Sequence, residues 1–106
     1  MKARVLTTAR ADNEARRATA WWRENRPAAP HLFEDELAEA IGLLAEHPDA
    51  GRPVARPGFP KLRALLLERT QHHLYYDHDA AAAKVVVRAV WGAVRGRPPR
   101  LQPKRR

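Results

Sequence analysis

The 106-residue sequence contains no cysteine and no long apolar run, and each absence excludes a class of protein. Without cysteine the chain has no disulfide framework, no thiolate zinc site and no cysteine nucleophile. Unbroken apolar stretches such as residues 80–83 and 85–87 are short, whereas a membrane-spanning helix needs about 20 largely apolar residues. The length excludes multidomain enzymes and large barrels. We therefore expect one domain in a reducing compartment, the cytoplasm.

Acidic residues are scarce in the second half of the chain. Residues 1–50 carry seven basic and nine acidic residues, a net charge of −2. Residues 51–106 carry thirteen basic and three acidic residues, a net charge of +10, and so account for the whole-chain charge of +8. This asymmetry predicts an acidic or polyanionic partner for the C-terminal half.

Hydrophobic periodicity predicts two helices near the N-terminus. The first covers about residues 9–25, with Thr7 or Thr8 as its cap, and the second ends at His47-Pro48. Pro27 separates them, because the residue before a proline is pushed out of the helical region. The two apolar stripes are Ala11, Ala15, Ala18 and Trp22, then Phe33, Leu37, Ala40, Ile41 and Leu44.

The remaining pattern predicts strands. Residues 4–7 are β-prone, residues 48–60 form a loop rich in proline and glycine, and residues 62–68, 72–77 and 84–91 form an antiparallel meander with a hairpin loop at 80–83. The predicted fold is an α+β two-layer sandwich of order β-α-α-β-β-β, with a helical hairpin on one face of a small, mainly antiparallel sheet. One domain spans residues 1–95, and a basic, proline-rich tail spans residues 96–106.

Strict alternation along the strands predicts which side chains share a face of the sheet. The face expected beneath the helices carries Leu65, Leu67, Leu74, Tyr76, Val87, Ala89 and Trp91. The open face is expected to carry Leu66, His73, Tyr75, Val86, Arg88 and Val90. Because monomeric proteins seldom expose so large an apolar patch, either a partner chain covers it or the face assignment is wrong. A further alternative is a sheet buried on both sides by the tail and loops. We favour a partner.

Several short segments, in their order and spacing, resemble the RelE/ParE superfamily of toxins from bacterial type II toxin–antitoxin systems. They are residues 11–12, 21–27, 33–37, 48–51, 62–63, 73–76 and 90–96. The resemblance implies a toxin held in a hetero-oligomeric complex by a cognate antitoxin, whose wrapping segments are often acidic. It implies one of two activities: inhibition of DNA gyrase in ParE-like members, or cleavage of mRNA on the ribosome in RelE-like members.

The residues favour the ParE-like branch. RelE-like toxins place basic residues on the first meander strand and often a tyrosine in the C-terminal segment, whereas this sequence has Ala64, Leu66 and, near the expected tyrosine, Leu101. If the chain is nevertheless a nuclease, His73 and Arg95 are the candidate catalytic pair. No cofactor is implied. A non-toxic, basic nucleic-acid-binding domain is a third alternative.

The candidate binding residues combine the open face with nearby arginines. The residues expected to bind the antitoxin or the target are Arg63, Leu66, His73, Tyr75, Arg88, Val90, Arg95 and Arg97. No metal site is expected, because the adjacent His72 and His73 point to opposite faces of a strand. Trp21 and Trp22 could form a base-stacking platform, but on an amphipathic helix we interpret Trp22 as core and Trp21 as a boundary residue.

Overall fold

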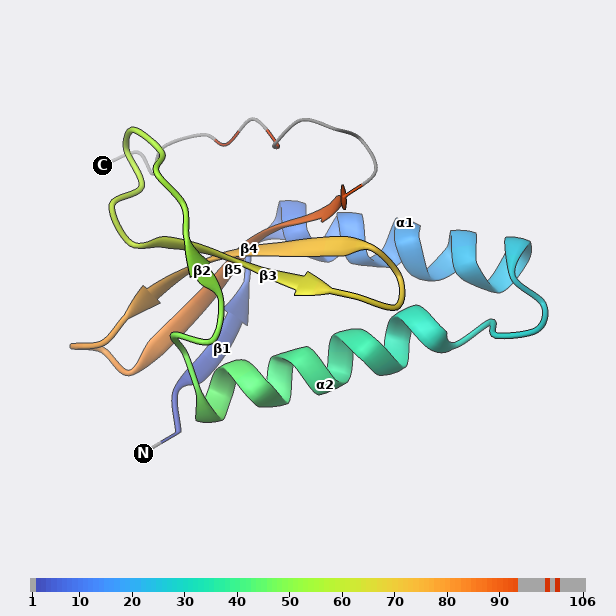
Figure 1. The fold of residues 1–106 in the computed structure, drawn as a ribbon, viewed down its shortest axis with the longest axis horizontal. Coiled ribbons are helices and arrows are strands. Elements are labelled where there is room, and N and C mark those ends of the chain that lie inside the picture. The colour runs from blue at the N-terminus through green and yellow to red at the C-terminus, as the bar shows by residue number, and fades with distance from the viewer. Residues whose placement is uncertain (1, 94–98, 100, 102–106) are drawn as a thin grey trace.

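The computed structural model describes residues 2–93, Pro99 and Leu101. Two helices follow a first strand, and four further strands complete the chain (Figure 1). Their bounds are β1 Arg4–Thr7, α1 Ala9–Asn25, α2 Leu32–Glu46, β2 Arg52–Pro53, β3 Leu62–Leu67, β4 His72–Asp79 and β5 Lys84–Gly92. The predicted α+β order is confirmed, with β2 as an addition. The expected boundary between residues 95 and 96 lies outside the described residues.

The five strands form one sheet in the order β1-β5-β4-β3-β2. Only the β1–β5 pair is parallel; it aligns Arg4 with Lys84 and Thr7 with Val87, while the other pairs are antiparallel. The short edge strand β2 lies inside the segment predicted to be a loop, because a two-residue strand containing Pro53 has no alternation to detect. Neither helix in the described part of the chain is long and apolar enough to cross a bilayer.

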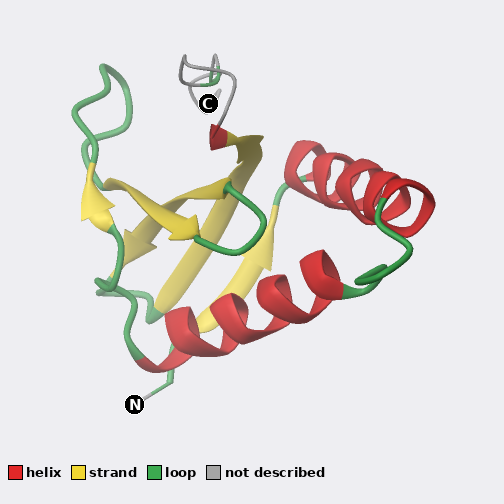
Figure 2. Ribbon diagram, turned by 45° about the vertical axis from the view of Figure 1, so that its right-hand side comes forward, coloured by secondary structure: helices red, strands yellow, loops and turns green. Residues whose placement is uncertain are grey.

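Both helices cover one side of the sheet, and the long loop between β2 and β3 rises away from them (Figure 2). We call the helix-covered side the inner face and the opposite side the outer face. The inner core contains Ala11, Phe33, Leu44, Leu74 and Tyr76, all at most 1% exposed. The predicted stripes of α1 and α2 therefore do face the sheet, since Ala15, Ala18, Trp22 and Leu37 pack against this core.

Local signals account for the helix boundaries. Thr8 caps α1, with its hydroxyl accepting a hydrogen bond from the backbone N–H of Ala11 at 3.1 Å. At the other end, the backbone N–H of Arg26 bonds the carbonyl of Trp22, and Pro27 prevents continuation. Acidic Glu34 and Asp35 occupy the first turn of α2, where the helix dipole stabilises negative charge.

A bulge in β5 overturns part of the predicted face assignment. Tyr75 of β4 pairs with Ala89, but Tyr76 pairs with Val87, so Arg88 is an extra residue in β5. An extra residue reverses the alternation beyond it. Val90 was predicted on the open face but is 6% exposed in the inner core, whereas Ala89 belongs to the outer cluster and Trp91 packs against that cluster. All three assignments were wrong for this reason.

Side chains of α1 satisfy the backbone of β5 beyond the end of β1. Since β1 ends at Thr7 while β5 continues to Gly92, the later backbone groups of β5 lack a strand partner on that side. The hydroxyl of Thr8 donates to the carbonyl of Arg88 at 3.2 Å, and Glu14 accepts from the N–H of Val90 at 2.9 Å. The sequence therefore uses helix side chains to complete the sheet.

Candidate functional site

The outer face carries a second, smaller apolar cluster. Phe59 from the β2–β3 loop covers Leu62, Ala64 and Tyr75, and Leu101 joins the same cluster. The face is thus less open than the sequence indicated, because the loop and Leu101 supply part of the cover. Tyr75, a predicted binding residue, is only 6% exposed.

Leu66 and His73 are the predicted binding residues that lie uncovered on this face. They are cross-strand partners in β3 and β4, and Leu66 is 39% exposed. The His73 ring lies 5.8 Å from that of Tyr75 in a tilted arrangement. Partial burial, with a smaller contribution from Arg52, lowers the pKa of His73, so its imidazole is neutral at pH 7. The pair presents an apolar surface beside an uncharged ring.

Two predicted arginines are already engaged within the fold. Arg63 lies on the same face of β3 as Leu65, the inner face. Its guanidinium donates to the carbonyls of Asp49 at 3.2 Å and Gly51 at 2.6 Å. Arg88 lies on the outer face, where it pairs with Asp77 and stacks 5.4 Å from the centre of the Phe59 ring. Neither guanidinium is free to bind phosphate without giving up these contacts. Arg95 and Arg97 lie outside the described residues.

A buried carboxylate that the sequence analysis did not single out fixes one end of the sheet. Glu36 of α2 is 7% exposed and accepts hydrogen bonds from the N–H of Arg69 at 2.8 Å, the N–H of Thr70 at 3.0 Å and the Thr70 hydroxyl at 2.6 Å. Burial by itself would raise the pKa of Glu36, but these hydrogen bonds outweigh it and hold the pKa below its usual value. Glu36 thereby secures the β3–β4 turn, in which Gln71 has a left-handed φ of 58°.

Tight packing explains the glycine of residues 48–51. The N–H of Gly51 donates to the Tyr76 hydroxyl at 2.9 Å. A Cβ at Gly51 would lie 2.7 Å from the carbonyl oxygen of Ala64 and 2.8 Å from the Tyr76 oxygen. No other residue fits there without displacement, so this segment is structural.

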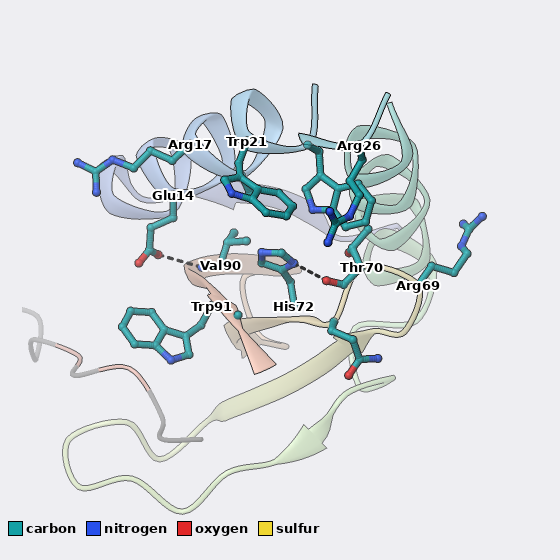
Figure 3. A pocket seen from close by; sticks show the side chains of 13 residues that line it. Glu14, Arg17, Trp21, Arg26, Arg69, Thr70, His72, Val90 and Trp91 are labelled. Atoms are coloured by element: carbon teal, nitrogen blue, oxygen red, sulfur yellow. Dashed lines mark hydrogen bonds between the residues drawn. The ribbon is translucent and has the colours of Figure 1, made fainter. Parts of the chain in front are cut away.

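A pocket of about 700 Å³ lies between α1 and the ends of β4 and β5. Figure 3 shows Trp21 and Arg26 on the α1 side of this pocket, with His72 and Val90 across from them. We call it the tryptophan pocket; its lining is Glu14, Arg17, Ala18, Trp21, Trp22, Arg26, Arg69, Thr70, Gln71, His72, Val90, Trp91 and Gly92. The adjacent tryptophans of α1 were the available sequence signal for this pocket.

Solved structures with the same fold come from toxin–antitoxin systems. The chromosomal ParDE system from P. aeruginosa superposes with a TM-score of 0.70 at 17% identity, covering 86% of this chain and 96% of that one. The RelBE2 toxin–antitoxin complex from Mycobacterium tuberculosis gives 0.62 at 20% identity, covering 88% and 94%. The isolated E. coli RelE toxin gives 0.57 at 18% identity, covering 86% and 84%. At such identities the likeness establishes the fold.

Sequence comparison identifies the branch of the superfamily. No curated protein sequence matches the chain. Residues 5–95 match the family of ParE toxins of type II toxin–antitoxin systems, parDE. The matched region spans both helices and every strand except the first residue of β1. The protein therefore belongs to the ParE toxin family.

Proposed function

We propose that this toxin arrests growth by contacting and inhibiting DNA gyrase, without catalysing a reaction itself, and that a cognate antitoxin neutralises it. The observation that carries the proposal is the chemistry of the outer face. Cleaving RNA would require a general base, a general acid and cations around the reacting phosphate. Among the described residues, the outer face offers an apolar surface and engaged arginines instead.

Strand β3 is where the contrast with a nuclease is sharpest. It presents Ala64, 3% exposed, and Leu66 toward the outer face, where RelE-like toxins carry basic residues. Neighbouring Arg63 is held by two backbone carbonyls, and Arg88 by Asp77. Such a surface suits protein contact, since apolar side chains without competing charge are typical of the centre of an interface.

The same surface suits an acidic antitoxin segment. Leu66 is one of the few large apolar side chains left exposed, and the half of the chain that contains it has a net charge of +10. An apolar side chain of an antitoxin segment would bury Leu66, and carboxylates of the same segment would complement the surrounding basic residues. Leu66 and His73 are the residues that we assign to this contact.

One observation favours a second candidate, a ribosome-dependent endoribonuclease. The lowered pKa of His73 keeps its imidazole neutral at pH 7, which is the form required of a general base. Arg95 would then be its cationic partner.

Purified gyrase decides between the two candidates. The wild-type toxin is expected to inhibit supercoiling of relaxed plasmid and to leave ribosome-bound mRNA intact. If supercoiling is unchanged while mRNA is cut, and the cutting disappears in His73→Ala and Arg95→Ala, the toxin is a nuclease.

Antitoxin contact is tested separately, with the antitoxin encoded beside the toxin gene. We expect Leu66→Ala to weaken antitoxin binding by about tenfold or more, as for the truncation of a central interface residue. Leu43→Ala is the matched control, because Leu43 is similarly exposed at 41% but belongs to α2. Equal affinity of wild type and Leu66→Ala would remove the outer face from the antitoxin interface.

A further inference from the structure

All three tryptophans of the chain line the tryptophan pocket. Trp21 and Trp22 come from α1 and meet edge to face, with ring centres 5.9 Å apart and planes at 72°. Trp91 borders the pocket from β5, beyond the bulge, but its side chain packs against the outer cluster. Trp21 remains 46% exposed, although burying such a ring would stabilise the fold. An exposed aromatic ring at a hollow is typical of ligand sites.

Two guanidinium groups at this pocket have no carboxylate partner among the described residues. Arg26 lies 4.8 Å from the ring centre of Trp21 and 5.7 Å from that of Trp22, and its hydrogen bond is to the carbonyl of Asn25. Arg17 lies on the α1 side of the same pocket (Figure 3). These two arginines leave positive charge available for an anion.

The other charged groups of the pocket are neutralised by the protein. Arg69 pairs with Glu39 at 2.8 Å and Glu36 at 3.5 Å. Glu14 pairs with Arg10 at 3.3 Å and accepts from the N–H of Val90. The field of the pocket is therefore set by Arg17 and Arg26, and it is positive.

We propose that the tryptophan pocket binds a nucleotide unit, with its base against Trp21 and its phosphate at Arg17, one helical turn before Trp21, while Arg26 adds positive charge on the other side of the ring. Indole faces stack on any base, and guanidinium groups bind phosphate through several parallel N–H donors. The volume of about 700 Å³ lies within the range of small-molecule sites. An acidic peptide would satisfy the arginines, but a ligand that joins an aromatic ring to a phosphate uses both features at once.

A free nucleotide and a nucleotide within a single strand share this chemistry, so the experiment has two arms. Purified full-length toxin is titrated with ATP and, separately, with a DNA single strand of about eight nucleotides. Binding is followed by tryptophan fluorescence and by calorimetry. Because Trp21 and Trp22 lie at the pocket, we expect a saturable fluorescence change in at least one arm. The arm that saturates identifies the source of the nucleotide.

Variants locate the binding. Trp21→Leu and Arg17→Ala are each expected to weaken affinity by about tenfold or more, as for the loss of one stacking or phosphate contact. Arg16→Ala is the matched control: it is the neighbouring arginine of α1, bonds to Asn13 and does not line the pocket. Its affinity should stay within about twofold of wild type. Thermal melting confirms that each variant folds, and Arg17→Ala, at an exposed position, tests the site even if Trp21→Leu does not fold.

Three results would overturn the proposal. The first is no saturation by either nucleotide in the low millimolar range. The second is binding that Trp21→Leu and Arg17→Ala leave unchanged, which would place the ligand on other basic residues. The third is saturation by a glutamate-rich peptide of about twelve residues when neither nucleotide binds, which would make the pocket a protein-binding site. Since gyrase takes no part in these titrations, their outcome is independent of the proposed gyrase inhibition.

Discussion

The inner and outer faces of the sheet are built from the same central strands but differ in how completely they are covered. Two helices close the inner face, and its largest side chains are 0% exposed. The outer face is covered only in part, by the β2–β3 loop, Leu101 and the Asp77–Arg88 ion pair. Leu66 and His73 stay accessible there. The inner face therefore carries most of the stability, while the outer face is available for partners.

Adjacent leucines of β3 give the most direct measure of this contrast. Leu67 is 3% exposed on the inner face, whereas Leu66 is 39% exposed on the outer face. Leu67→Ala should lower the free energy of unfolding by about 2–5 kcal/mol, because it leaves a cavity in a packed core. Leu66→Ala should cost no more than about 0.5 kcal/mol. Urea unfolding measures both, and equal losses would contradict the difference between the faces.

The acid-to-amide change Glu36→Gln should have the next largest effect, about 2–3 kcal/mol at pH 7. Three donors from Thr70 and Arg69 bond this carboxylate, and hydrogen bonds to a buried charge are the costly ones to disturb. Since the pKa of Glu36 is lowered in the folded state, its contribution is present above the unfolded pKa of about 4.3 and is lost as pH falls through the folded pKa. Urea melts of both proteins should converge as pH drops below about 4.3. A gap that persists undiminished at acidic pH would show that the charge is irrelevant.

Glycine substitutions compare tight and open surroundings. Gly51→Ala should destabilise the protein by about 1–3 kcal/mol, because its Cβ would clash with the Ala64 carbonyl and the Tyr76 hydroxyl. Gly42, inside α2, has nothing within 4 Å of a Cβ, so Gly42→Ala should stabilise by about 0.5–1 kcal/mol. Opposite shifts in melting temperature are expected; a stabilised Gly51→Ala would mean that β2 and β3 are less closely packed.

The smallest effect is expected for the same acid-to-amide change on the outer face. Asp77 pairs with Arg88, and both side chains keep about a fifth of their surface exposed. The pair still reaches water, and an asparagine keeps an oxygen that can accept from Arg88, so the change costs less than at a more deeply buried carboxylate. Asp77→Asn should cost at most about 1 kcal/mol in urea melts, well below Glu36→Gln. A loss as large as that of Glu36→Gln would show that the outer face is as tightly organised as the inner one.

Hydrophobic periodicity and helix-breaking prolines predicted the fold, because both helices bury long apolar stripes and end just before a proline. The edge strand β2 was missed, since two residues including Pro53 carry no pattern. The faces of β5 were predicted correctly up to Val87 and wrongly from Ala89 to Trp91, because one inserted residue reverses alternation without any sequence mark. Within the site, Arg63 and Glu36 show most clearly what the sequence could not predict. Their types were evident in the sequence, but their partners at Gly51 and Thr70 depend on the tertiary fold.

Supercoiling by purified gyrase at increasing concentrations of wild-type toxin and of His73→Ala tests the non-catalytic account most directly. We expect wild type to inhibit supercoiling and His73→Ala to inhibit it with potency reduced by about tenfold at most, because the ring contributes contact area rather than proton transfer. Losing a general base costs about 10²–10⁴ in rate. Undisturbed supercoiling with wild type, together with ribosome-dependent mRNA cleavage that falls by that factor in His73→Ala, would contradict the account.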